Sequence, residues 1–165
     1  MPNYSYEWEK LEKDSRNIIT SYHQEFPVKV GNIAKELGLT VKSSTLGAGV
    51  SGEIRLEEGK YVIRVNRHDV KERQRFTVAH EIAHFLLHRD LIGDGLVDDV
   101  LYRSKLPSNL ETEANRLAAD ILMPIALVNE AMANVEAQKM EEKIEKLAAD
   151  AQVSITAMKI RLGKE

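Results

Sequence analysis

Residues 78–87 are apolar except for three side chains, His80, Glu81 and His84. The surrounding pattern predicts a helix over residues 70–88, and a helix that is apolar on most sides is usually central and buried. Polar groups on such a helix are unfavourable unless they find partners. The chain must therefore adopt a fold that encloses this helix and gives its three polar side chains something to bind.

The spacing of the two histidines suits a metal ion. Positions i and i+4 lie one turn apart on the same face of a helix, so His80 and His84 can point at one ion. Zinc accepts two imidazoles in this arrangement. Glu81 is offset by about 100° around the helix and can reach a water on the metal rather than the metal itself. The alternative is a buried helix with two incidentally spaced histidines.

The chemistry that needs these residue types is amide hydrolysis. Zinc acidifies its bound water and polarises a carbonyl group, and a carboxylate takes the proton of the water and later delivers it to the leaving amine. The motif therefore predicts a zinc peptidase with His80 and His84 as ligands and Glu81 as the general base. Cysteine is absent, which excludes thiolate ligands and a cysteine nucleophile.

A catalytic zinc needs a third protein ligand. His88 lies one turn further along the same helix, where a third ligand gives poor tetrahedral geometry, so we interpret it as a helix-end or pocket-wall residue. The predicted helix 109–122 offers Glu111 and Glu113. Ser108 and Glu111 fit a capping box, which gives Glu111 a structural role. Glu113 is the expected ligand because the zinc needs a third donor, although a charge on the flank of the helix is the alternative.

Two further residues are candidates for supporting roles. Asp120 lies two turns beyond Glu113 on nearly the same face and can orient a ligating histidine, although a charge on the flank of the helix is the alternative. Tyr102 is a candidate pocket residue that can stabilise an oxyanion. It belongs to residues 89–107, which we expect to form a long functional loop.

The rest of the chain predicts an α+β fold in which a small antiparallel sheet packs on the central helix. The elements are assigned by helical or alternating apolar spacing and by their breakers. Helices are expected at 7–22, 29–37, 125–135, 140–149 and 154–162, and strands at 39–45, 52–57 and 60–65. Glu58 and Gly59 predict a tight hairpin turn. We expect one domain over residues 1–165, with a core at 25–125 and a C-terminal helical extension at 125–165.

Charge and hydropathy point to a soluble cytoplasmic protein. The net charge is -3, no signal peptide is visible and no apolar stretch approaches membrane length. Residues 147–162 are similar to a helix-turn-helix with a mildly basic last helix. The modest charge favours a plain packing unit instead, so we expect no direct DNA binding.

Residues 75–88 resemble the active helix of the ImmA/IrrE-type metallopeptidases, and residues 113–124 resemble their second motif. The likeness covers roughly residues 25–125. The resemblance implies a compact zincin-like fold with one zinc bound by His80, His84 and Glu113. Manganese or another divalent ion can occupy such a ligand set.

The resemblance also implies a function. Members of this family cleave a regulatory partner, often a DNA-binding repressor or an antitoxin, in stress response, mobile-element control or toxin–antitoxin systems. Many carry a fused helix-turn-helix domain, for which this chain leaves no room before residue 25, so we expect the repressor to be a separate protein. The alternative is a non-proteolytic metal-containing module that binds a repressor or DNA.

Overall fold

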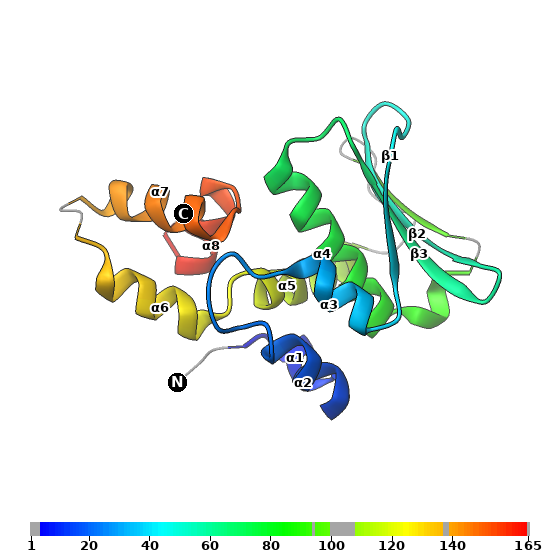
Figure 1. The fold of residues 1–165 in the computed structure, drawn as a ribbon, viewed down its shortest axis with the longest axis horizontal. Helices are drawn as coiled ribbons and strands as arrows, with labels where there is room; N and C mark the ends of the chain where they lie inside the picture. Colours follow the sequence, from blue (N-terminus) through cyan, green and yellow to red (C-terminus); the bar gives the residue numbers. More distant parts are fainter. Residues whose placement is uncertain (1–3, 94, 100–107, 137–138, 165) are drawn as a thin grey trace.

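A single long helix, α4 (Lys71–Leu87), separates a sheet on one side from the remaining helices on the other (Figure 1). The computed structural model describes residues 4–93, 95–99, 108–136 and 139–164. Nine consecutive residues of α4, from Thr77 to Phe85, are buried. This confirms the expectation of a buried central helix in an α+β fold.

The sheet has four strands in the order β1-β3-β2-β4. They are β1 (Thr40–Ser44), β2 (Val50–Glu57), β3 (Lys60–Asn66) and β4 (Leu96–Asp99). The sheet predicted as antiparallel is mixed: β2 pairs antiparallel with β3 and β4, whereas β1 pairs with β3 in parallel. Four of the seven residues of β3 are buried, as expected for an inner strand that pairs with another strand along each of its two edges.

The hairpin between β2 and β3 has the predicted two-residue turn. Glu57 pairs with Lys60, and the two turn residues have positive φ angles, 51° at Glu58 and 79° at Gly59. Two left-handed residues in succession match the right-handed twist of the flanking strands. The turn therefore fixes the register of the two central strands.

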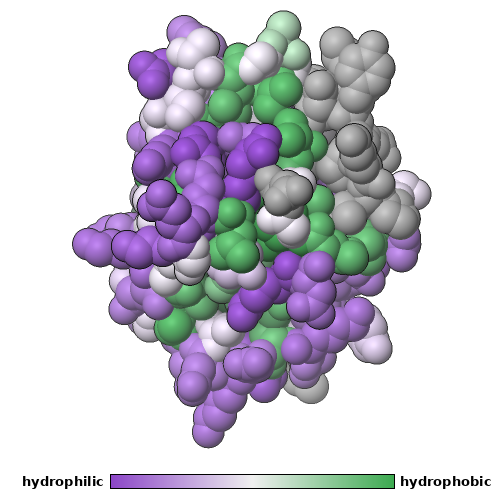
Figure 2. Space-filling model, turned by 90° about the vertical axis from the view of Figure 1, so that its right-hand side faces the viewer, coloured by the Kyte–Doolittle hydropathy of each residue, from purple (hydrophilic) through white to green (hydrophobic). Residues whose placement is uncertain are grey.

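The two faces of the sheet differ in polarity because side chains alternate along a strand. Ile54 and Ile63 pair across β2 and β3 and are fully buried beneath α4. Glu53 and Arg64 pair on the opposite face, where Arg64 also binds Glu57. Figure 2 looks onto the sheet-bearing end of the molecule and shows hydrophilic side chains over much of it, with hydrophobic ones in the middle.

The N-terminal segment forms two helices where one was predicted over residues 7–22. They are α1 (Tyr6–Glu9), which is capped by the Ser5 hydroxyl, and α2 (Lys13–Thr20). The break between them lets Trp8 and Leu11 reach the core together with Ile19 of α2. The next helix, α3 (Val30–Glu36), ends before Gly38 as predicted.

The predicted helices after residue 107 are confirmed as α5 (Ser108–Leu122), α6 (Ile125–Asn134), α7 (Met140–Ala151) and α8 (Ile155–Leu162). The expected loop over residues 89–107 is only partly correct. It contains the 3₁₀ helix η1 (Arg89–Leu91) and the edge strand β4, while residues 94 and 100–107 lie outside the described part.

Asp120, the predicted support of a ligating histidine, contacts residues at the beginning of α1 and in α8 in the described part of the chain. Its fully buried carboxylate accepts hydrogen bonds from the Ser5 backbone N–H at 3.1 Å and from Arg161 at 3.1 Å. Burial raises the pKa of Asp120, although Ser5 and Arg161 oppose the shift. The aspartate thus ties the beginning of α1 and the end of α8 to α5.

Arg161 is held by the same contacts. Its Nε donates to the Met123 carbonyl oxygen at 2.7 Å, so this basic group of the helix-turn-helix-like segment binds other parts of the same fold.

Within the described ranges no single helix has both the length and the apolarity to span a membrane. Helices α5 and α6 meet those limits only as a pair, which is bent by 50°.

His23 makes the stability of this fold depend on pH. Its Nε2–H donates to the Ile121 carbonyl oxygen at 2.9 Å, and burial lowers the pKa of the ring to about 4. The unfolded chain, with a histidine pKa near about 6.5, binds this proton first. The stabilisation is therefore complete above about pH 6.5 and is lost as the pH falls toward 4.

We predict that His23→Gln, which can still donate to Ile121, removes this part of the acid sensitivity. Between pH 7 and pH 4 the wild-type free energy of unfolding should fall by about 2–3 kcal/mol more than that of the variant. Urea titrations of both proteins at each pH measure the difference. Equal losses in the two proteins would show that His23 does not titrate differently on folding.

Candidate metal centre

Two neighbouring helices bring three electron-pair donors together. His80 and His84 project from one face of α4, and Glu111 projects toward them from the first turns of α5. The Nε2 atoms of the histidines are 3.0 Å apart, and the Glu111 oxygens lie 3.3 Å from His80 Nε2 and 2.9 Å from His84 Nε2. All three residues are buried, and these donor atoms lie within 4.8 Å of one another.

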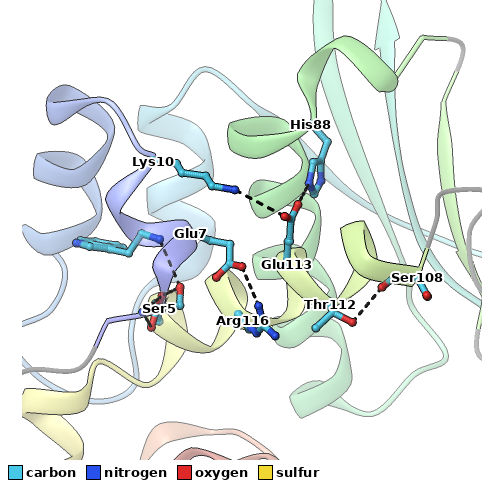
Figure 3. Close-up of polar contacts among 10 residues, drawn as sticks. Ser5, Glu7, Lys10, His88, Ser108, Thr112, Glu113 and Arg116 are labelled. Carbon is cyan, nitrogen blue, oxygen red and sulfur yellow. Dashed lines mark hydrogen bonds and ion pairs between the residues drawn. The ribbon is translucent and has the colours of Figure 1, made fainter.

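The structure does not place Glu113 with the histidine pair, where the family resemblance put the third ligand. Two residues along a helix correspond to a rotation of about 200°, so Glu111 and Glu113 cannot face the same point. The Glu113 carboxylate instead lies 2.8 Å from His88 Nε2 and 3.6 Å from Lys10 Nζ (Figure 3). The candidate third ligand is thus Glu111, whose carboxylate faces the histidines rather than serving only as a helix cap.

The second nitrogen of His80 is held by a residue that the sequence analysis missed. Asn115 lies one turn after Glu111, and its Oδ1 accepts a hydrogen bond from His80 Nδ1–H at 2.8 Å. A proton on Nδ1 leaves the lone pair of Nε2 directed at the cluster. Asn115 therefore fixes both the ring orientation and the tautomer of His80.

His84 is held through His88 and Glu113. His84 Nδ1 lies 3.0 Å from His88 Nδ1, and His88 Nε2 lies 2.8 Å from Glu113 Oε1. A consistent proton assignment has His84 Nδ1–H donating to His88 and His88 Nε2–H donating to Glu113, which again leaves His84 Nε2 as a lone-pair donor. The predicted helix-end position of His88 is confirmed, but its ring is buried behind the cluster.

The donor set fits a divalent metal ion. Two imidazole lone pairs and a carboxylate that converge in a buried place repel one another unless a cation lies between them. Burial opposes ionisation of Glu111, but the two histidine rings beside it outweigh burial and hold the pKa of the carboxyl well below its usual range. Two nitrogens on a tetrahedral zinc lie about 3.3 Å apart, close to the spacing observed here.

Glu81 lies next to the cluster on the side of the sheet. Glu81 is fully buried. A Cβ atom at Gly52 of β2 would come within 3.5 Å of Glu81 Oε2 and within 2.3 Å of Thr77 Cγ2. Only glycine allows Thr77 of α4 to approach β2 this closely, and the Glu81 carboxylate lies near the same position of the strand.

A cavity of about 920 Å³ opens beside the cluster and gives it access to solvent. His80 and Glu111 line the cavity, whereas His84 is fully buried behind them. Its far wall is formed by the end of α7 and by α8, which faces α4 across the molecule (Figure 1). Tyr102, the predicted pocket residue, lies outside the described residues.

A buried helix with His80, Glu81 and His84, covered by a small sheet and joined by a glutamate from the next helix, defines a zincin-like α+β domain. The model of the IrrE N-terminal-like domain, a peptidase family, matches residues 34–163 of this chain. The chain belongs to that family.

Individual relatives agree with this assignment over part of their length. The radiation response metalloproteases IrrE of Deinococcus deserti and Deinococcus radiodurans are each 42% identical to it, over 72 and 71 residues. Each match covers 42% of this chain but only 25% and 21% of the respective relative. A transcriptional regulator of Mycobacterium tuberculosis shares the fold, with a TM-score of 0.62 and 16% identity over 97% of this chain and 48% of that one.

If Glu111 is the third ligand, Glu111→Gln should abolish stoichiometric zinc binding, because it removes the negative charge that completes the donor set. The matched variant Glu113→Gln should still bind one zinc per chain, with an affinity reduced about 10- to 100-fold because the support of His84 is weakened. Competition titration with a chromophoric chelator measures both affinities. Loss of zinc from the Glu113 variant alone would return the ligand to Glu113.

Proposed function

We propose that the chain is a zinc-dependent endopeptidase. The observation that carries this proposal is the meeting of His80, His84 and Glu111 at the end of a cavity, with Glu81 one residue from the first histidine. Three protein donors and one open side are what a catalytic zinc requires, whereas structural zinc sites are closed by four ligands. When bound, zinc would supply acidification of a water and polarisation of the substrate carbonyl.

The residues of the chain divide the remaining work among them. Asn115 and His88 hold the rings of His80 and His84 in place, so the site is organised before substrate arrives. Glu81 accepts the proton of the attacking water and delivers it to the nitrogen of the leaving amine, which balances the hydrolysis of one peptide bond. Its burial against β2 keeps the carboxylate close to where the carbonyl must lie.

The cavity suits a peptide segment with apolar side chains. Val70, Ile155 and Ile160 line it and are 66%, 45% and 57% exposed, which makes them three of the nine large apolar residues exposed in the described part of the chain. Exposed apolar side chains gathered at one cavity mark a binding surface. Two of them belong to α8, so the C-terminal helices form one wall of the proposed substrate site.

The proposed substrate is a regulatory protein, either a DNA-binding repressor or an antitoxin. The name of the Deinococcus relatives, radiation response metalloprotease, supports a role in stress response, and control of mobile elements is the alternative. The contacts of Asp120 with both ends of the chain support the further proposal that residues 1–165 act as one domain. If the substrate contacts α8, the C-terminal helices take part in substrate binding.

The function is tested by searching for cleavage that depends on Glu81. Glu81→Gln should bind zinc as the wild type does, because Glu81 is not a ligand in this proposal. It should lose at least about 100-fold of the peptidase activity, because the general base is removed. Both zinc-loaded proteins are incubated with a native cell extract, and new protein N-termini are identified by mass spectrometry.

New termini that require both zinc and Glu81, and that fall in helix-turn-helix repressors or antitoxins, are the expected result. New termini that require Glu81 but fall in unrelated proteins would support the peptidase activity and contradict the proposed substrate class. Stoichiometric zinc without Glu81-dependent cleavage would favour the non-proteolytic binding module.

A further inference from the structure

A β-bulge places Ser51 at the edge of the metal site. Val50 of β2 pairs with Asp99 of β4 and Gly52 pairs with Asp98, so Ser51 is an extra residue without a partner in the register. Bulges redirect a side chain and are common beside active sites. Ser51 lines the same cavity as His80 and Glu111.

The hydroxyl of Ser51 is buried without a hydrogen-bond partner among the described residues. The residue is 8% exposed, and its Oγ is inaccessible and makes no hydrogen bond there. An unpaired buried hydroxyl is unfavourable, and native proteins satisfy nearly all such groups. The hydroxyl is thus unsatisfied among the described residues while Ser51 itself lines the cavity, so a change of its side-chain rotamer would let Oγ–H pair with a ligand there.

The position of Ser51 also agrees with a role toward substrate. Its neighbour Gly52 lies near Glu81, since a Cβ atom built on Gly52 would be 3.5 Å from Glu81 Oε2. A chain that passes along the cavity toward the donors must therefore pass the Ser51 hydroxyl close to the general base. The group that such a chain offers at every residue, whatever its sequence, is a backbone carbonyl oxygen.

We propose that Ser51 Oγ–H donates a hydrogen bond to a backbone carbonyl oxygen of the peptide substrate, at a residue flanking the scissile bond. This inference rests on the proposed function. The bond positions the peptide between Glu81 and the donors of α4 and α5, and it satisfies the hydroxyl only in the substrate complex. Ser51 is accordingly a substrate-positioning residue, and it contacts neither the metal nor its ligands in this role.

The test compares Ser51→Ala with wild type in the zinc-loaded full chain. The probe is a tripeptidyl hydroxamate with apolar side chains, which carries a zinc-binding group and flanking backbone carbonyls. Acetohydroxamate, which lacks a flanking backbone, is the matched probe. Binding of both is measured by calorimetry, together with zinc affinity and the thermal unfolding midpoint.

Ser51→Ala should weaken the tripeptidyl probe about tenfold, the loss of one hydrogen bond in an enclosed site, and leave acetohydroxamate binding and zinc affinity unchanged. Its thermal midpoint without probe should stay the same or rise, because the deleted hydroxyl has no hydrogen-bond partner among the described residues. The control Ser5→Ala lies outside the cavity and removes the cap of α1, whose Oγ accepts from the Trp8 N–H at 3.3 Å. That variant should unfold at a lower temperature and bind the probe as wild type does.

Each other outcome overturns the inference. Equal tripeptide binding by Ser51→Ala and wild type would show that the hydroxyl does not contact the peptide. A parallel fall in zinc affinity or in acetohydroxamate binding would show that Ser51 acts through the metal site. Failure of zinc-loaded wild type to bind either hydroxamate would reject the proposed function itself, and the role of Ser51 with it.

Discussion

Three electron-pair donors, the Nε2 atoms of His80 and His84 and the carboxylate of Glu111, meet in a buried place that only a cation makes favourable. The rest of the fold keeps them there. Gly52 allows α4 to lie close to β2, and α5 packs against α4 so that Glu111 and Asn115 reach the two histidines. Asp120 then secures the other end of α5 to both termini.

Each of the two histidines in the candidate metal site is held by a second side chain. Residues one turn apart serve each histidine: Asn115 follows Glu111 on α5 and holds His80, while His88 follows His84 on α4 and holds His84. Glu113 and Lys10 extend the second chain of contacts to α1 (Figure 3). The N-terminal helix therefore contacts the support of the metal site, although it lies far from it in the sequence.

Local patterns in the sequence predicted the parts that depend on local physics. The buried helix, the Glu58–Gly59 turn and most helix bounds follow from periodicity and turn chemistry. The third ligand did not, because the capping pattern at Ser108 gave Glu111 another role, and the phase of α5 against α4 depends on tertiary packing. The pairing of Glu111 with Asn115 at the i,i+4 spacing of His80 and His84 was the available signal. The parallel pairing of β1 with β3 and the bulge at Ser51 are long-range features that no single segment encodes.

Anomalous diffraction at the zinc edge, from crystals of the zinc-loaded protein, tests whether His80, His84 and Glu111 hold one metal ion. We expect one strong anomalous peak per chain, about 2.0–2.2 Å from both Nε2 atoms and from a Glu111 oxygen, on the side open to the cavity. A peak bound by Glu113 or His88 in place of Glu111 would contradict the ligand set. No peak at α4 in crystals that contain zinc would contradict the metal site altogether.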